Sequence, residues 1–196
     1  MHRLTSAFIL GYHGCSASVA EQLISGASTF KASDNDYDWL GPGIYFWQSN
    51  PRRALRFAEE KRARDSATRS PAVVGAAIDL GLCLDLSTEA GVLEVRAAYD
   101  LLRATFEKAV TQLPSNASGS DLMLRRLDCA VVRQMHAVRE ESGELPVDTV
   151  RGIFVEGDPV YEGSGFRAKT HVQICVCNPA TIRGIFKVPA EDMEAP

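Results

Sequence analysis

Aromatic residues surround a tight turn in the segment YDWLGPGIYFW, which spans residues 37–47. A Gly-Pro-Gly turn breaks helices and interrupts strands. It also lets the backbone come close to a ligand, because glycine has no side chain to hold a partner away. The segment therefore indicates a binding site for something flat, bordered by aromatic faces.

Two further segments place polar side chains on β-like runs. His13 and Gly14 lie at the end of the run that begins SAFILGYH, and Gln173 lies in the run HVQICVCN. His171 comes two residues before Gln173, so both side chains face the same side of a strand. The loop DPVYEGSGFRAKT, which precedes the last of these runs, contains Glu162. Loops of this length in a compact domain are typically functional or disordered.

Alternating β-like and helical runs must position these residues. We expect strands at 6–13, 43–47, 149–157, 171–178 and 183–188, and a β-like run at 71–86. A helix follows each of the first two strands. One covers the run SVAEQLISGA; the other begins at Asn50-Pro51, with Asn as cap and Pro at the first helical position, and ends at about Arg64.

A helical block separates the early strands from the late ones. Its first helix is expected from Ser87 or Thr88 to about Gln112, and its second follows the polar loop PSNASGS and ends at Gly143. The expected apolar stripe of the first helix is Val92, Val95, Tyr99, Leu102 and Phe106. The sequence thus predicts one domain over residues 1–196 with a helical insertion at about 87–143.

Composition narrows the class of protein. A chain of 196 residues fits one domain and is long enough to bury a core. Its net charge of −4, from 21 basic and 25 acidic residues, gives no reason to expect non-specific binding to nucleic acid or to a membrane surface. The basic run at 52–69 could contact phosphate, but we favour its interpretation as the solvated side of a helix. No segment approaches membrane-spanning length, and the N-terminal apolar run is too short for a signal peptide.

The cysteines indicate neither disulfides nor a metal site. There are five of them and no CxxC pair, and Cys175 and Cys177 would share one face of a strand. Without a second Cys/His cluster nearby, we expect no metal and interpret them as reduced, mostly buried thiols of a cytoplasmic protein.

Three segments together resemble the signature of the ADP-ribosyltransferase superfamily, closest to the branch of poly-ADP-ribose polymerases and diphtheria-type toxins. The matching residues are Tyr12-His13-Gly14, Gly43-Ile44-Tyr45-Phe46 and His171-Val172-Gln173-Ile174. That branch carries His, Tyr and Glu, so this chain departs at the third position. The resemblance is good over residues 1–65 and moderate over the last quarter, and the helical block has no counterpart. It implies an α+β fold of split antiparallel sheets, with the nicotinamide end of NAD in the cleft between them.

The resemblance also implies roles for individual residues. Tyr45 and an aromatic residue of the next helix, with Phe57 the candidate, would hold the nicotinamide ring. Backbone of Gly14 and Gly43 would approach the ligand. His13 would bind the adenosine ribose hydroxyls and act as neither acid nor base. Tyr37, with Trp39, would lie over the ribose or shape the entrance.

The third position decides the expected chemistry. Gln173 can accept a hydrogen bond from the ribose 2′-hydroxyl and orient the sugar, but an amide is no base and adds no negative charge beside a developing cation. The activity would then depend on positioning, or on an acid supplied elsewhere. Glu162 is the sequence candidate, because in the family its loop faces the acceptor.

Three functions follow, and they stay open at this point. The leading one is a mono-ADP-ribosyltransferase acting on a protein or nucleic acid, as bacterial toxins and phage-defence effectors do, with an antitoxin or immunity protein as a further partner. The second is an NAD glycohydrolase, and the third is a non-catalytic domain that binds NAD or ADP-ribose. The related RNA 2′-phosphotransfer needs basic residues around the cleft, which the sequence does not indicate.

Overall fold

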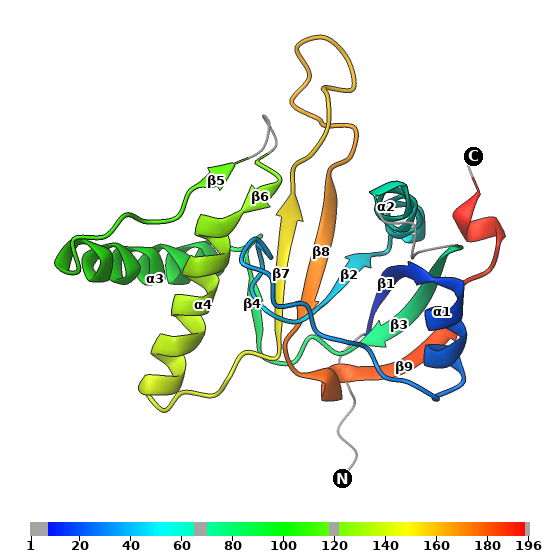
Figure 1. The fold of residues 1–196 in the computed structure, drawn as a ribbon, viewed down its shortest axis with the longest axis horizontal. Coiled ribbons are helices and arrows are strands. Elements are labelled where there is room, and N and C mark those ends of the chain that lie inside the picture. The colour runs from blue at the N-terminus through cyan, green and yellow to red at the C-terminus, as the bar shows by residue number, and fades with distance from the viewer. Residues whose placement is uncertain (1–7, 65–69, 118–121, 195–196) are drawn as a thin grey trace.

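The computed structural model describes residues 8–64, 70–117 and 122–194. They form a seven-stranded sheet with helices on both faces and a small two-stranded sheet at one side (Figure 1). The large sheet contains β1 (Ile9–Ser16), β2 (Ile44–Gln48), β3 (Pro71–Ile78), β4 (Cys83–Asp85), β7 (Thr149–Phe154), β8 (His171–Val176) and β9 (Ile182–Lys187), and the small one β5 (Asn116–Ala117) and β6 (Leu124–Arg125). The helices are α1 (Ala17–Ile24), α2 (Pro51–Arg64), α3 (Glu89–Lys108) and α4 (Arg126–Glu141), with 3-10 turns η1 (Pro179–Thr181) and η2 (Glu191–Met193). The expected α+β class is confirmed.

The strand order of the large sheet is β4-β7-β8-β2-β1-β3-β9. Its pairs are antiparallel except for β4 and β7, which are parallel. The two separate sheets that the resemblance implies are here hydrogen-bonded into one, and the join between them is narrow. β1 pairs with β2 at Gly11↔Gln48 and Tyr12↔Trp47, whereas it pairs with β3 from Ile9 to Ser16.

Register divides the side chains between two faces of the sheet. Tyr12 is paired with Trp47, and Trp47 with Gln173, so these three share what we call the first face. His13 and Phe46, one residue along their strands, lie on the opposite face. Helices α3 and α4 cover the first face over β4, β7 and β8, and α2 covers it over β1 and β3. The stretch of β2 and β8 between these helices carries the candidate site.

Each face has its own apolar core. Under α3 and α4 the buried residues are Leu40, Leu84, Ala98, Leu102, Val131, Val132, Met135, Val147, Val150 and Cys175. On the opposite face they are Ile44, Phe46, Ala76, Ile78, Ile174 and Val176, with Phe30 packed against them. These cores hold β2 and β8 rigidly from both sides.

Helix α2 begins as its sequence predicts. The Asn50 side-chain Oδ1 accepts a hydrogen bond from the backbone N–H of Arg53 at 3.0 Å, and Pro51 is the first helical residue. The helix lies directly on β1, because a Cβ at Gly14 would stand 2.1 Å from the carbonyl oxygen of Ala54. Gly14 is therefore required for helix packing.

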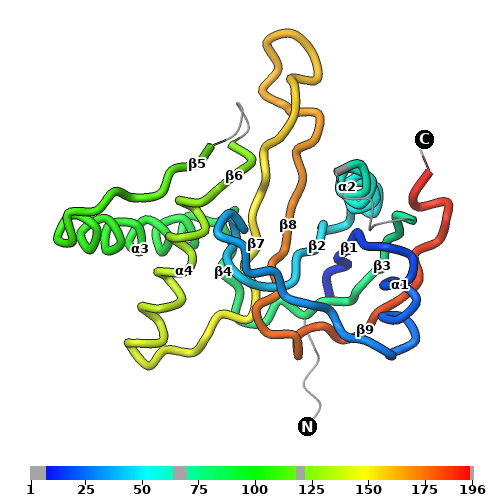
Figure 2. Tube along the Cα trace, viewed as in Figure 1, coloured from blue at the N-terminus to red at the C-terminus, as the bar shows by residue number. Residues whose placement is uncertain are grey.

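The helical block is the crossover between the parallel strands β4 and β7 (Figure 2). Helix α3 starts where expected, with the Thr88 hydroxyl accepting from Gly91 N–H at 3.1 Å. The predicted stripe is wrong at Val92, which is 53% exposed, whereas Leu102 is buried as predicted and Ala98 is an additional buried position. Parallel strands need such a long connection, so the block is part of the sheet's architecture.

The β7–β8 connection projects from the top of the sheet (Figures 1 and 2), and we call residues 155–170 the arm. Backbone hydrogen bonds from Val160 to Phe166 and from Ala168 to Asp158 tie its two sides together. Among the described residues, no helix combines the length and apolar character needed to cross a membrane.

Candidate functional site

Gln173 lies in the middle of the sheet, paired with Trp47 of β2 and Gly152 of β7. Its side chain is half-buried, and its Oε1 accepts a hydrogen bond of 2.6 Å from Trp39 Nε1. Because this bond fixes the amide oxygen on the Trp39 side, the NH2 group of Gln173 faces the other side as a donor.

A line of rings runs along the first face past Gln173, and we call it the aromatic row: Trp39, Phe154, His171, Trp47 and Phe57. Successive ring centroids lie 5.1, 5.5, 6.2 and 4.8 Å apart. The rings of Phe154 and His171 are stacked within 18°. The other three neighbouring pairs are tilted by 71°, 46° and 44°, and Trp47, Phe154 and His171 are buried. The row is therefore a staggered, largely apolar layer whose partly exposed ends are Trp39 and Phe57.

A buried charged cluster connects α2 to the base of the arm, and it consists of Arg53, Glu156 and His171. Arg53 Nη2 donates to the two Glu156 oxygens at 3.0 and 3.3 Å, and the two side chains are 7% and 5% exposed. His171 Nδ1 lies 3.9 Å from the nearer Glu156 oxygen. Burying such a pair costs much of what it gains, so the cluster points to function more than to stability.

Two buried polar atoms beside this cluster have no hydrogen-bond partner among the described residues: His171 Nε2 and Trp47 Nε1. His171 Nδ1 lies 2.7 Å from the carbonyl oxygen of Lys169, which can only accept, so Nδ1 carries the proton and Nε2 is an acceptor. Burial lowers the pKa of His171 and keeps its ring neutral. A buried acceptor and a buried donor on neighbouring rings mark a place for a polar ligand or water.

A cavity of ≈ 200 Å³ opens between α2 and the base of the arm. It is lined by Asn50, Arg52, Arg53, Arg56, Ala168, Lys169 and Thr170. The prediction that the basic run forms a solvated helix face is wrong for Arg53, which is 6% exposed. A set of basic residues, three of them from the basic run at 52–69, therefore surrounds a cavity next to the aromatic row.

His13 lies on the face opposite Gln173, at the narrow join between β1 and β2. Its Nδ1–H donates to the Tyr45 carbonyl oxygen at 2.9 Å, where β1 separates from β2. The ring packs against Phe30 and Phe46, with centroids 5.3 and 5.7 Å away. Burial lowers the pKa of His13. Its Nε2 is thus an acceptor, the form that a ribose hydroxyl requires.

Tyr45 holds the Gly-Pro-Gly turn in place. Its hydroxyl accepts from Leu40 N–H at 3.0 Å and donates to the Gly41 carbonyl at 2.8 Å, and its ring packs on the core under α4. Burial raises the pKa of this hydroxyl. Phe57 packs against Trp47 in another apolar cluster, so Tyr45 and Phe57 do not form a shared sandwich.

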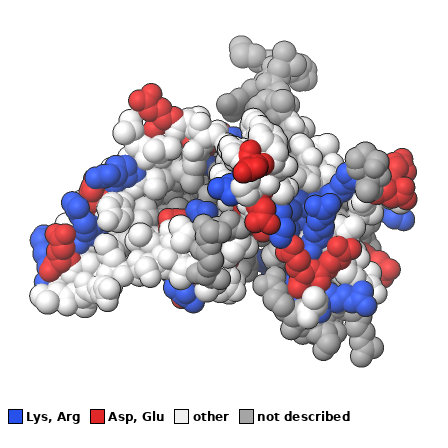
Figure 3. All heavy atoms as spheres, turned by 90° about the horizontal axis from the view of Figure 1, so that it is seen from above, with Lys and Arg blue, Asp and Glu red and all other residues white. Residues whose placement is uncertain are grey.

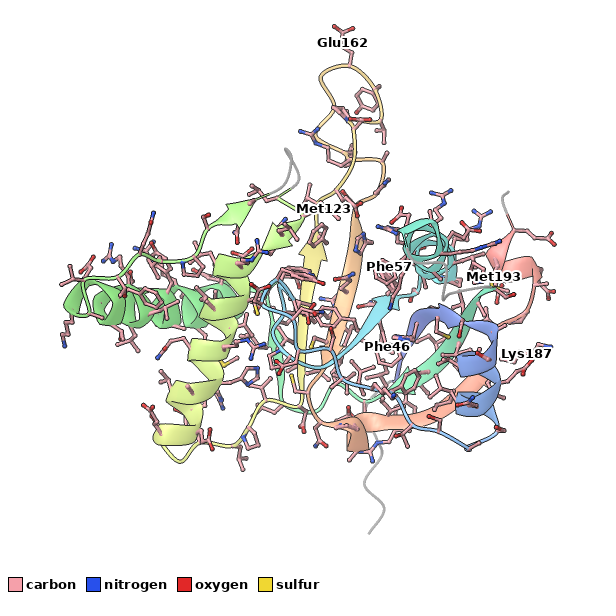
Figure 4. All side chains as sticks on the ribbon, in the orientation of Figure 1. Phe46, Phe57, Met123, Glu162, Lys187 and Met193 are labelled. Atoms are coloured by element: carbon pink, nitrogen blue, oxygen red, sulfur yellow. The ribbon has the colours of Figure 1, made fainter. Side chains whose placement is uncertain are left out.

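The remaining expected residues lie around these elements. Gly43 exchanges backbone hydrogen bonds with Ser33 at 2.7 and 2.9 Å, and a Cβ on it would stand 2.5 Å from Cys175 Sγ. Close packing therefore explains why position 43 is glycine, as it does for Gly14. Tyr37 is 41% exposed before the turn. Glu162 lies at the tip of the arm, away from the sheet (Figure 4).

Several residues of this site do not stand out in the sequence. Both tryptophans of the chain border Gln173, Trp39 by a hydrogen bond and Trp47 by strand pairing. That the chain has only two tryptophans was the sequence feature that could have pointed to them. Glu156 and Arg53 gave none, because a pair 103 positions apart has no local pattern.

Comparison with protein-family models gives no match to this chain, and no curated protein is similar to it at a significant level. The site must therefore be interpreted from its own chemistry.

Proposed function

We propose that the chain is an ADP-ribosyltransferase that cleaves NAD at its nicotinamide glycosidic bond and transfers ADP-ribose to a macromolecular acceptor. The observation that carries the proposal is the strand order β8-β2-β1 within the sheet. Three segments from the two ends of the chain become neighbours, although the His13 side chain lies on the face opposite Gln173. The proposal places NAD where these strands meet.

The unpartnered atoms of the site suit a nucleoside. His171 Nε2 needs a donor and Trp47 Nε1 needs an acceptor, and a ribose supplies both kinds of group. The partly exposed Phe57 end of the aromatic row, next to Trp47, offers a face for the nicotinamide ring. In this proposal the ring borders Trp47, where Tyr45 and Phe57 were expected to hold it.

Gln173 would orient the ribose in the reaction. The C1′–N bond breaks and leaves its electron pair on nicotinamide, while a nucleophilic atom of the acceptor donates a pair to C1′ and loses a proton. The sugar is cationic at the transition state, and its reaction depends on how it is oriented. With its oxygen held by Trp39, the Gln173 amide offers its NH2 group to a ribose hydroxyl oxygen, and Trp39 is a positioning residue that fixes this direction.

Glu156 replaces Glu162 as the assisting carboxylate in this proposal. Glu156 lies at the base of the arm, 3.9 Å from His171 Nδ1, and His171 shares a face with Gln173. Its negative charge is thus fixed on the side where positive charge develops, although Arg53 offsets part of it.

The test is release of nicotinamide from NAD by the purified protein with a cell lysate, followed by separate protease and nuclease digestion of the labelled product. We expect Gln173→Ala to lower kcat far more than NAD affinity, because orientation matters most at the transition state. Gln22→Ala, at an exposed position of α1, is the matched control. Release without labelled product would indicate a glycohydrolase, and binding without release a non-catalytic domain.

Gln173→Glu and Trp39→Phe sharpen this test. A carboxylate at position 173 adds charge stabilisation, so NAD hydrolysis should be retained or raised. Trp39→Phe keeps the ring but removes the 2.6 Å hydrogen bond, so kcat should fall about tenfold with little change in KM. Wild-type rates in all three variants would contradict the assignment of Gln173.

A further inference from the structure

The cavity beside α2 contains a guanidinium with unused donors. Arg53 uses Nη2 for Glu156, but its Nε and Nη1 are buried and have no hydrogen-bond partner among the described residues. Nη1 lies 3.7 Å from Glu60 Oε2, which is an ion pair too long for a hydrogen bond. Its side chain is only 7% exposed and lines the cavity. Arg52 Nη2, on the same wall, is also buried without a partner. Buried donors of this kind require an acceptor.

The start of α2 adds to the positive character of the cavity. This fourteen-residue helix has no acidic residue in its first turn, so its partial positive charge is not offset there. Asn50 and Arg52, at that helix end, line the cavity. Helix N-termini with arginines beside them bind phosphate through N–H donors and charge.

Charge count favours an anion of low charge. Arg52, Arg53, Arg56 and Lys169 line the cavity. Three carboxylates stand close by: Glu156 and Glu60 lie 3.7 and 3.6 Å from Lys169 Nζ, and Glu59 borders the next hollow along α2. Four cations against three carboxylates leave an excess of one positive charge, which matches a phosphodiester. In the view from above (Figure 3), basic side chains gather over α2 beside the arm, with carboxylates among them.

The size of the cavity limits what enters it. Sites that enclose drug-sized ligands measure roughly 300–1,000 Å³, and this cavity is ≈ 200 Å³. It can take a phosphate group with part of its ester but no whole dinucleotide. A ligand larger than a phosphate ester would extend beyond the cavity onto the neighbouring surface.

The neighbouring surface is the arm, which carries exposed rings. Tyr161 and Phe166 are 61% and 70% exposed. At most about 11 Å of backbone separates Phe166 from Lys169 in the cavity wall. Exposed rings next to a cationic groove are the features with which proteins bind single-stranded nucleic acid, because every base stacks and every phosphate is negative.

We propose that this cavity binds a backbone phosphate of a single-stranded nucleic acid, whose bases stack on Tyr161 and Phe166. Binding needs no catalysis, whereas its role as the acceptor of ADP-ribose rests on the proposed function. The site lies beside the aromatic row, because Arg53 belongs to the cavity wall and its Cζ lies 5.9 Å from the centroid of the Trp47 ring. A bound strand would therefore present its nucleophile next to the reacting sugar.

The test is fluorescence anisotropy with a labelled single-stranded RNA of twelve nucleotides, and the same DNA, without NAD. We compare wild type with Arg52→Gln/Arg56→Gln and, as matched control, Arg62→Gln, an exposed α2 residue outside the cavity wall. The double variant should weaken binding at least tenfold and reduce the slope of log Kd against log salt by about one. Arg62→Gln should change binding less than twofold.

Tyr161→Ala and Phe166→Ala separate stacking from charge. Each should weaken binding about fivefold or more without changing the salt slope. Circular dichroism checks that all variants fold.

The outcomes distinguish this inference from the proposed function. RNA or DNA binding lost in the double variant supports the inference even where wild type releases no nicotinamide. No binding of either strand at low salt overturns it, as does equal loss in Arg62→Gln. The inference is also wrong if the double variant binds RNA normally but loses affinity for NAD, since the cavity then holds a dinucleotide phosphate.

Discussion

The two ends of the arm place similar residues in opposite environments. At its base, Glu156 is 4% exposed and paired with Arg53. At its tip, Glu162 extends from the molecule (Figure 4), between rings that are largely exposed. Both glutamates belong to the same connection between β7 and β8. Environment, more than residue type or position in a motif, decides which of them can act in a buried site.

The base of the arm is suited to positioning the reacting groups, and its tip is suited to recognising a partner. The base is held by α2, β7 and β8, so its charges can be fixed relative to Gln173. The tip contacts none of these strands in Figure 4 and is free to meet a partner. A loop that contains both kinds of end can couple acceptor binding to a rigid site.

The largest expected effect is on the charge pair at the base. Glu156→Gln leaves Arg53 buried without its carboxylate, which should lower the free energy of unfolding by about 3 kcal/mol or more. Urea denaturation measures it. The double variant Arg53→Met/Glu156→Leu should recover most of the loss, because it removes both charges from the interior. If Glu156→Gln were as stable as wild type, Arg53 and Glu156 would not form a buried ion pair in the folded protein.

Acidification tests the neutral histidines. Burial lowers the pKa values of His171 and His13, so the unfolded chain binds protons that the folded chain does not. Their contribution to stability is complete above about pH 6.5 and is lost as the pH falls below it, by at most about 1.4 kcal/mol per pH unit for each histidine. His171→Asn should reduce this pH dependence of the unfolding free energy. An unchanged dependence would mean that His171 titrates normally at the base of the arm.

Two cysteines away from the arm show the same effect of environment on a side chain, here on the pKa of the thiol. Burial raises the pKa of Cys15 to about 11. At the lower end of β8, a hydrogen bond from Cys175 and the neighbouring His136 ring, 4.0 Å away, lower the pKa of Cys177 to about 5.

Cys177 should therefore react with iodoacetamide at pH 7 about tenfold faster than Cys15, since its larger thiolate fraction outweighs its lower nucleophilicity. Peptide mass spectrometry reads both sites in one sample. His136→Ala should slow Cys177 alone, and equal rates in the wild type would show that the partners have no effect.

The smallest expected effect is at the tip. Glu162→Gln should change the unfolding free energy by less than about 0.5 kcal/mol, as exposed substitutions do. Nicotinamide release should also stay at the wild-type rate. A loss of release comparable to that of Gln173→Ala would return Glu162 to the catalytic role that the sequence suggests and would reverse the comparison of base and tip.

The sequence predicts elements well where local signals set them. The Asn50-Pro51 start of α2, the Thr88 cap of α3 and the strands around Tyr45 and Gln173 follow from caps and β-like runs. Pairing across long separations was not predictable. No local pattern indicates that Arg53 meets Glu156, or that the register of β1, β2 and β8 places His13 and Gln173 on opposite faces.

The position of β8 in the sheet has a consequence for how the protein is made. β8 lies between β7 and β2, yet it begins only at His171. The ribosome adds about 5–20 residues per second. On it, β2 cannot pair with β8 until residues 171–176 have been synthesised. Until then the Trp39–Gln173 contact and the base of the arm do not exist. An incomplete chain that ends before His171 therefore lacks the site, because β8 supplies Gln173 and His171.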